Sequence, residues 1–479
     1  MTVKLKPELQ TDVNKIKTTN KESFRDSVNN ITKEGKRDFI YPKKPKGRFY
    51  RYRTFFSVVL LVILLAAPFI KISGHPFMLF NILERKFILF GLAFGPHDFY
   101  IFGLAVITFI VFIFLFTAVF GRVFCGWACP QTVFLEMVFR KIEYLIEGDH
   151  LSQRRLNSAP WDLVKITKKF TKWLIFALIS VIIANILIAW VVGTDDLIKI
   201  ISEPVSQHSA GFIAMALFSI TFYSIFAWFR EYACIYICPY GRLQGVLLDP
   251  NSVVIAYDDI RGEPRGKIKK GEDRKLGDCI NCNECVVVCP TGIDIRNGTQ
   301  LECVNCTACI DACDNVMDKI DKPRGLIKYA SENMILNRTK FKITPRIITY
   351  TVLFSILITI TTVLMVKRKP IDVTILRMPG MMYQEQPGGK ISNLYSVKLA
   401  NKTFDPVSIK MELDDIEGEI MVIGSDIVLE PNAVSEAKFL VLIPKEKIKK
   451  MNTKLEIEIL MNDEKFQEYK TTFLGPGVN

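Results

Sequence analysis

Histidine is scarce in this chain, and several cofactor motifs are missing from it. Only 4 histidines occur among 479 residues and none lies in a long apolar segment, which disfavours paired haem ligation inside a membrane. The sequence has no CxxCH haem-attachment motif, no flavin signature and no GxGxxG motif after a strand pattern. A redox role would therefore need electrons from another protein or from a quinol.

Cysteine is absent from both terminal parts, since all 12 cysteines lie between residues 125 and 313. The region 370–479 shows alternating apolar and polar residues in short runs, separated by Gly, Asn, Asp and Pro. This pattern predicts a β-sandwich of about seven short strands. Without disulfides, such a domain depends on its apolar core alone.

Long apolar runs are abundant. Hydrophobic residues make up 49% of the chain and the mean hydropathy is +0.23. A bilayer core of roughly 30 Å requires about 20 apolar residues in a helix. The segment 78–95 has charges in its middle and is predicted to be interfacial or re-entrant. The five predicted spans are 54–70, 99–120, 170–192, 212–229 and 346–366.

The distribution of Lys and Arg predicts the orientation. Residues 1–53 contain 15 of them and 230–345 contain 17, whereas 193–211 contain one. By the positive-inside rule, the N-terminus and the connections after the second and fourth spans are cytoplasmic, and the tail after residue 366 is external. The basic run 367–369 opposes the rule, but a folded tail follows its preceding helix. The net charge of +13 is thus a topology signal, and no nucleic-acid-binding motif accompanies it.

The cysteines after residue 278 form two runs of CxxCxxCxxxC. In this arrangement each run gives three thiolates to one [4Fe–4S] cluster and its fourth thiolate to the other cluster. Structural zinc usually takes two CxxC pairs with a spacer, and disulfides are rare in a reducing compartment. The predicted ligands are Cys279, Cys282, Cys285 and Cys313 for the first cluster, and Cys303, Cys306, Cys309 and Cys289 for the second.

A CxxxCP motif follows the second span and another follows the fourth. The spacing i, i+4 would place both sulfurs of a pair on one helical face, with the proline ending or kinking the helix just beyond. Buried free cysteine is the ordinary alternative, but the repeat at equivalent positions favours a site for copper or for an additional cluster. The candidate redox site consists of Cys125, Cys129, Cys234 and Cys238.

Three stretches resemble the cytochrome c oxidase accessory protein family CcoG, also called FixG or RdxA. They are FCGWACPQTVFLE, CPTGIDIRNGTQLECVNC and CTACIDACDNVMDKIDKPRGLIKYAS. The resemblance extends over nearly the whole chain from about residue 38. It implies a multi-domain membrane protein with about five transmembrane helices, a cytoplasmic α+β two-cluster ferredoxin-like domain and a C-terminal all-β Ig-like sandwich.

The predicted domains follow from these observations together. They are a basic disordered cytoplasmic arm (1–48), spans one to four with the CxxxCP motifs (49–250), the ferredoxin-like domain (251–340), span five (341–369) and the external sandwich (370–479). The resemblance further implies a protein of the bacterial inner membrane whose sandwich is periplasmic.

The resemblance implies a cupric reductase that converts Cu(II) to Cu(I) for assembly of cbb(3)-type oxidases. Its partners would be the membrane, copper ions, oxidase subunits or copper chaperones, and an electron donor that is a protein or a quinol. Two alternatives stay open: a quinol-linked subunit of a respiratory chain, and a non-enzymatic assembly scaffold or redox sensor. The sequence does not choose between copper and a further cluster at the CxxxCP cysteines.

Overall fold

The structure is a computed structural model of the chain. Residues 1–38, most of the predicted arm, lie outside the described part. The structure describes residues 39–476 except 73, 82–85, 90, 96–97, 268–275, 381, 415, 425–426, 432 and 449.

The chain forms two compact units. Unit 1 contains the residues up to 67, together with 106–189 and 195–358. Unit 2 contains 68–105, 190–194 and the residues from 359 onward. All 12 cysteines therefore belong to unit 1.

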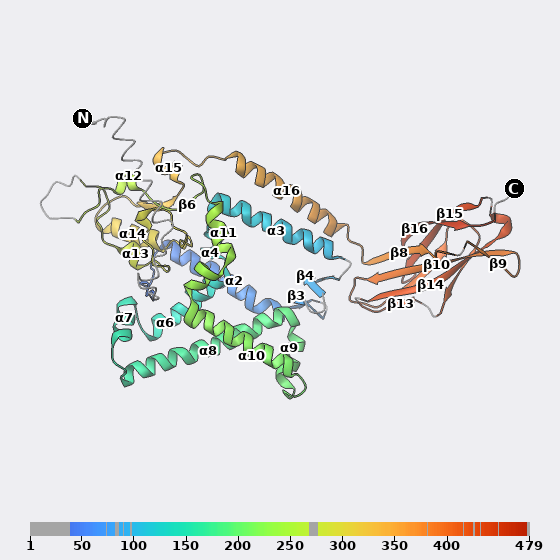
Figure 1. The fold of residues 1–479 in the computed structure, drawn as a ribbon, viewed down its shortest axis with the longest axis horizontal. Coiled ribbons are helices and arrows are strands. Elements are labelled where there is room, and N and C mark those ends of the chain that lie inside the picture. Colours follow the sequence, from blue (N-terminus) through green and yellow to red (C-terminus); the bar gives the residue numbers. More distant parts are fainter. Residues whose placement is uncertain are drawn as a thin grey trace. The chain divides into compact units, whose positions relative to one another are not determined.

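Five helices in the described residues are long and apolar enough to cross a membrane, which confirms the five predicted spans. The helix at 163–192 begins before its apolar stretch because Asp162 accepts a hydrogen bond from the backbone N–H of Lys165 at 2.7 Å and caps its first turn. Figure 1 shows these helices, which are α2 (Arg48–Ala66, continued by η1, Ala67–Phe69), α3 (Phe99–Phe120), α8 (Leu163–Val192), α10 (Ser209–Ser224, continued by η4, Ile225–Phe229) and α16 (Pro345–Val366).

Aromatic side chains hold the helices of unit 1 together. The rings of Phe112 in α3 and Phe354 in α16 lie 5.6 Å apart. A buried aromatic core joins α8 and α10 to the segment after the first CxxxCP motif, and Phe139 stacks on Phe226 at 4.9 Å. The shorter helices are α4 (Val123–Trp127), α5 (Pro130–Val133), η3 (Phe134–Phe139), α6 (Arg140–Ile146), α7 (His150–Ser158), α9 (Thr194–Ser202), η5 (Ala233–Ile237) and α11 (Pro239–Leu247).

The segment that carries the two CxxCxxCxxxC runs folds as small helices on a two-stranded antiparallel sheet. Ile255, Leu326 and Ile327 of this sheet region are each 1% exposed and pack in one core with the cysteines. The predicted α+β character is confirmed. Its elements are β6 (Val254–Tyr257), α12 (Asp259–Gly262), α13 (Glu284–Val287), η6 (Ile295–Asn297), α14 (Ala308–Lys319), β7 (Ile327–Ala330) and α15 (Glu332–Leu336).

The C-terminal part of unit 2 is a β-sandwich, as predicted, shown in orange and red in Figure 1. One sheet has the order β12-β14-β10-β8 with β9 beside β10, and the other has the order β13-β11-β15-β16. Tyr395 is fully buried, stacks on Phe439 and donates to the carbonyl of Thr472 in the facing sheet at 2.9 Å. The strands are β8 (Ile371–Arg377), β9 (Gln384–Gln386), β10 (Lys390–Asn401), β11 (Val407–Leu413), β12 (Glu419–Ile423), β13 (Ile427–Leu429), β14 (Val434–Pro444), β15 (Asn452–Met461) and β16 (Glu464–Leu474), with η7 at Lys445–Lys447.

The expected number of about seven strands is too low, because β9 and β13 have three residues each and are too short to show alternation. The segment predicted to be interfacial contains a three-stranded antiparallel sheet, in the order β3-β4-β5. The short strands of this part of unit 2 are β1 (Lys71–Ile72), β2 (His75–Pro76), β3 (Met78–Asn81), β4 (Lys86–Leu89) and β5 (Leu92–Phe94).

Candidate iron–sulfur and thiol sites

The two CxxCxxCxxxC runs adopt the same backbone path. The residue before the second cysteine is left-handed in both runs, with φ 54° at Asn281 and 53° at Asn305. The residue after it is also left-handed, with φ 60° at Asn283 and 67° at Thr307. A β-branched residue such as threonine rarely adopts this conformation. The paired strain indicates that both loops are shaped to turn their sulfurs inward.

Each set of predicted cluster ligands lines one cavity. Cys285 lies at the boundary and lines both cavities, so the two are adjacent. The first cavity is lined by Cys279, Cys282, Cys285 and Cys313, and the second by Cys289, Cys303, Cys306 and Cys309.

Polar side chains support both loops. The guanidinium of Arg296 donates to the amide oxygens of Asn281 at 2.7 Å and Asn283 at 2.8 Å, which fixes the first loop. In the second cavity the hydroxyl of Thr291 lies 3.4 Å from the sulfur of Cys289. A hydroxyl at that distance can donate to a thiolate.

Burial keeps these thiols protonated when nothing is bound. It raises the pKa of Cys285 to about 12, with an additional increase from neighbouring acidic groups. Burial likewise raises the pKa of Cys303 to about 12 and that of Cys306 to about 11. Binding of iron requires thiolates, so it must release these protons.

The donor sets fit a cluster better than a single metal ion. In the described part of the chain, no three His, Cys, Asp or Glu side chains lie close enough together to hold one ion. The cysteines nevertheless line shared cavities. Four cysteines arranged around a cavity, rather than around a point, match the ligation of a four-iron cubane.

The CxxxCP motifs differ from the prediction of one continuous helix. Cys125 lies in α4, but Cys129 is extended, with ψ 124°. Cys234 lies in η5, and Cys238 is extended, with ψ 110°. The prolines begin the next helices at their first position instead of ending the previous ones. The physical reason is that proline disfavours the helical conformation in the residue before it and suits the first helical turn.

The charges of the four thiols act on one another, which indicates that the thiols lie near one another. Burial raises the pKa of Cys234 to about 12, and Cys129, Cys125 and Cys238 raise it further. Burial also raises the pKa of Cys129, the backbone hydrogen bonds from α5 to its thiolate lower it, and the charge of Cys238 raises it. We call these four cysteines the thiol site.

A buried polar chain surrounds Cys125. Its sulfur donates to the side-chain oxygen of Gln244 at 2.9 Å, and the Nε of Arg122 donates to the same oxygen at 3.1 Å. The amide nitrogen of Gln244 donates to Thr117 at 3.3 Å, and the hydroxyl of Thr117 lies 3.2 Å from that of Tyr240. Burial raises the pKa of Cys125 to about 11, although Arg122 lowers it.

The thiol site packs directly on the second cluster loop. A Cβ on Gly126 would lie 2.3 Å from the carbonyl oxygen of Val304 and 2.9 Å from that of Asn305. The carbonyl of Gly126 accepts from Arg53 at 2.7 Å. Cys125 also belongs to the same buried core as the cysteines of both cavities. The first CxxxCP motif and the second cluster loop are therefore in direct contact.

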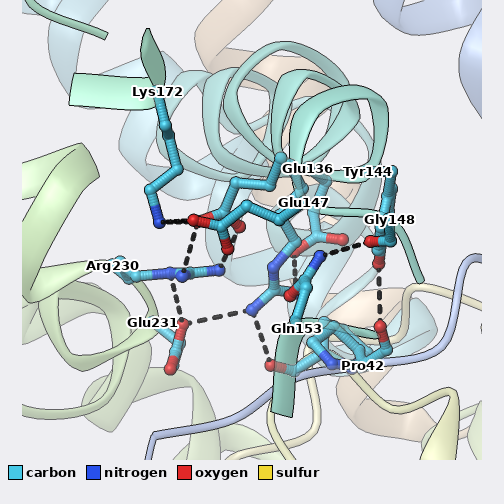
Figure 2. Close-up of polar contacts among 12 residues, drawn as sticks. Pro42, Glu136, Tyr144, Glu147, Gly148, Gln153, Lys172, Arg230 and Glu231 are labelled. Carbon is cyan, nitrogen blue, oxygen red and sulfur yellow. Dashed lines mark hydrogen bonds and ion pairs between the residues drawn. The ribbon is translucent and has the colours of Figure 1, made fainter. Parts of the chain in front are cut away.

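A buried network of charges joins the segments around both sites (Figure 2). Arg140 is 1% exposed; it pairs with Glu136 and Glu231 and donates to the carbonyl of Pro290, directly after Cys289, at 3.2 Å. Arg230 pairs with Glu143 through two hydrogen bonds of 3.0 and 3.1 Å. The network thus connects the segment after the first CxxxCP motif, the segment before the second one, and Pro290 at the end of the first CxxCxxCxxxC run.

Sequence reasoning missed several of these side chains. Arg122 follows an apolar span, so it is easily taken for an interface anchor. No local pattern marks Gln244 or Asn305. Asp311 accepts hydrogen bonds from the backbone N–H groups of Phe49 at 3.1 Å and Tyr50 at 2.7 Å and so caps α2 from α14. Asp311 lies between Cys309 and Cys313, and this spacing predicts a role only for the cysteines.

Comparison with known proteins finds three matching family descriptions. Residues 229–332 match a 4Fe-4S dicluster domain. Residues 102–156, which include Cys125 and Cys129, match a 4Fe-4S binding domain. Residues 361–476 match the Ig-like fold at the C-terminus of FixG.

The chain is similar to three curated proteins over most of its length. It is 38% identical to protein RdxB of Cereibacter sphaeroides over 77% of this chain and 80% of RdxB. It is 33% identical to protein RdxA of the same organism, over 85% of this chain and 89% of RdxA. It is 31% identical to the nitrogen fixation protein FixG of Rhizobium meliloti, over 86% of this chain and 87% of FixG.

Proposed function

Because the chain belongs to the FixG/RdxA family of membrane iron–sulfur electron-transfer proteins, we propose that it reduces Cu(II) to Cu(I) at the thiol site, for assembly of a cbb(3)-type oxidase. A [4Fe–4S] cluster supplies one electron at a time. The two cysteine sets Cys279/Cys282/Cys285/Cys313 and Cys303/Cys306/Cys309/Cys289 would each hold one.

The observation that carries the proposal is the shared core of Cys125 and the cluster cysteines. Close packing at Gly126 brings the first CxxxCP motif directly against the second cluster loop. Cys282 is exposed whereas Cys279 and Cys285 are buried. An external donor would therefore dock beside the first cluster, and electrons would leave through the second.

The thiol site supplies the chemistry that favours the reduced metal. Cu(I) is a soft cation and prefers thiolate ligands, whereas Cu(II) prefers nitrogen and oxygen donors. No three described His, Cys, Asp or Glu side chains lie close enough to hold one ion, so two thiolates of the thiol site would hold copper, and they would stabilise the product more than the substrate. The electron lowers the charge on copper from +2 to +1, and binding of the ion by thiolates releases the protons of the cysteines that hold it.

We further propose the topology and partners that the charge pattern supports. The basic N-terminal region and the cluster-bearing segment would face the cytoplasm, and the sandwich would face the periplasm. The donor would be a protein or a quinol, and the recipients of Cu(I) would be oxidase subunits or copper chaperones.

A second candidate for the thiol site is an additional [4Fe–4S] cluster. The match of residues 102–156 to a 4Fe-4S binding domain favours it. That segment contains only Cys125 and Cys129, so Cys234 and Cys238 would complete the ligand set. Copper would then receive its electron at the edge of this cluster.

The experiment compares anaerobically purified wild type with Cys125→Ser/Cys129→Ser and Cys303→Ser/Cys306→Ser. Iron and acid-labile sulfide are counted, the protein is reduced, Cu(II) is added, and Cu(I) is trapped with a chromogenic chelator. We expect the first variant to retain the iron of wild type and lose Cu(I) formation, and the second to lose about half of its iron.

Each alternative predicts another result. If Cys125→Ser/Cys129→Ser loses iron relative to wild type, the thiol site holds a third cluster. If reduced wild type forms no Cu(I), the copper function is wrong. Turnover with a quinol in proteoliposomes would then favour a respiratory subunit, and normal oxidase assembly by the Cys303→Ser/Cys306→Ser variant would favour a scaffold.

A further inference from the structure

Arg122 is a buried cation without a carboxylate partner. It is 4% exposed and makes no ion pair within the described residues. Arg140, at 1% exposure, is instead paired with both Glu136 and Glu231. Burying an unpaired charge costs free energy unless an anion compensates it. The anion that compensates Arg122 must therefore come from what its surroundings bind.

The contacts of Arg122 extend to both redox sites. Its Nε shares the side-chain oxygen of Gln244 with the sulfur of Cys125. Its Nη1 donates to the carbonyl of Leu301, two residues before Cys303. The planar fork of arginine can hold two such partners at once, which an ammonium group does less well.

The position of Arg122 brings its charge close to both sites. Its contact with Gln244 places it beside Cys125 of the thiol site. Its contact with the Leu301 carbonyl places it beside the loop that carries Cys303. Glu302 is the nearby carboxylate, but no ion pair joins it to Arg122, and burial favours its neutral form.

We propose that Arg122 is the positioning residue that joins the thiol site to the second cluster loop and compensates the negative charge of both. The inference rests on the function proposed above and adds a residue that none of the family descriptions assigns. Its guanidinium holds the Leu301 carbonyl close to the Gln244 side chain that contacts Cys125. Its positive charge makes reduction of the group held by the second cysteine set more favourable.

The electron balance is simple. Cu(II) at the thiol site gains one electron and becomes Cu(I), and the iron–sulfur group of the second cysteine set loses that electron. No bond to Arg122 forms or breaks, and it remains protonated throughout. Its effect on the potentials is electrostatic and depends on its charge, whereas its contacts with Gln244 and Leu301 depend on the planar guanidinium.

The test compares Arg122→Gln with Arg122→Lys in the full-length protein. Midpoint potentials of both centres are measured by EPR-monitored redox titration, and Cu(I) affinity by competition with a chelator. For Arg122→Gln we expect a negative shift confined to the second centre and a loss of Cu(I) affinity of about tenfold or more. Arg122→Lys should retain the wild-type potentials.

Arg346→Gln is the matched control. It removes one positive charge from the same unit, but Arg346 contacts Asp249 at 3.4 Å and none of the cysteines. Both potentials and the Cu(I) affinity should equal those of wild type. If the midpoint potentials of both centres shift equally in Arg122→Gln, the substitution has loosened the fold as a whole, and the proposal is wrong. The proposal is also wrong if neither potential shifts.

Two further outcomes are decisive. If Arg122→Gln cannot retain iron, Arg122→Lys decides: unchanged potentials support the charge role, and a negative shift of the second centre contradicts it. If wild type forms no Cu(I), the copper function fails, but the potentials of the two centres still test Arg122 independently.

Discussion

Glu143 lies at the centre of the buried charge network. Its two oxygens accept from Arg230, and Lys172 lies 3.6 Å away. Glu143→Gln removes the carboxylate that accepts both hydrogen bonds from the buried Arg230 and leaves Arg230 with the longer contact to Glu231, at 3.6 Å. We expect the free energy of unfolding of unit 1 to fall by about 3–5 kcal/mol, measured by unfolding in detergent micelles.

The pH dependence of this loss follows from the pKa of Glu143. Burial raises that pKa, but Arg230, Lys172 and Arg140 outweigh burial and the net shift is downward. The carboxylate therefore stabilises the fold fully above its ordinary pKa, and this contribution is lost as the pH falls through the lower folded-state pKa. The difference between wild type and Glu143→Gln should accordingly shrink in acid.

Asp318→Asn is the control for burial. Asp318 also forms two hydrogen bonds to an arginine, Arg324, at 2.7 and 2.8 Å, but both side chains are exposed. Solvent screening makes such pairs weak, so this change should have little effect. Equal effects of the two substitutions would show that burial of the Glu143 network contributes nothing.

At the scale of elements, α4 packs closely on the second cluster loop, and the contact is made by backbone atoms. Gly126 has ordinary helical backbone angles, so Gly126→Ala introduces no backbone strain. Its Cβ would nevertheless lie 2.3 Å from the carbonyl oxygen of Val304. We expect a loss of about 1–3 kcal/mol in stability and slower electron transfer to the thiol site, measured by stopped-flow reoxidation.

Gly103→Ala isolates the effect of that contact. A Cβ on Gly103 would meet nothing within 4 Å, and the residue lies inside α3. Alanine there should leave the helix as stable or slightly more stable. If both alanine variants transfer electrons at the wild-type rate, the packing of α4 on the second cluster loop does not set the distance between the second cysteine set and the thiol site.

The cysteine motifs illustrate which parts of a site can be predicted. The predicted ligand sets follow from spacing, because a cubane requires three close thiols and a fourth from elsewhere, and each predicted set lines one cavity. The path of the CxxxCP motifs does not follow from i, i+4 spacing, because Pro130 and Pro239 impose extended conformations on Cys129 and Cys238. The two prolines begin the following helices, whereas the prediction places them at the ends of the preceding ones.

At the scale of the whole molecule, the five spans were predictable because each is encoded by a local run of apolar residues. Long-range ion pairs were not, since their partners are far apart in sequence. Arg368 opposes the positive-inside rule in the sequence, but in unit 2 it pairs with Asp98 at 2.8 Å. Its charge is thus neutralised locally.

Asp98 has a further partner in unit 2. It is fully buried and also pairs with Lys402 of the sandwich at 2.7 Å. Asp98→Asn would leave the nearly buried Arg368 and Lys402 without their shared anion. We expect unit 2 to lose about 3–5 kcal/mol of stability, measured by its thermal unfolding and by proteolysis of the sandwich.

Iron content separates this effect from damage to the redox sites. All cysteines belong to unit 1, so Asp98→Asn should retain the iron of wild type while its sandwich unfolds earlier. Asp372→Asn is the control, because Asp372 contacts the same Lys402 at 3.9 Å but is 55% exposed. Loss of iron in Asp98→Asn, or equal destabilisation in Asp372→Asn, would contradict the role of Asp98 as the buried anion that holds unit 2 together.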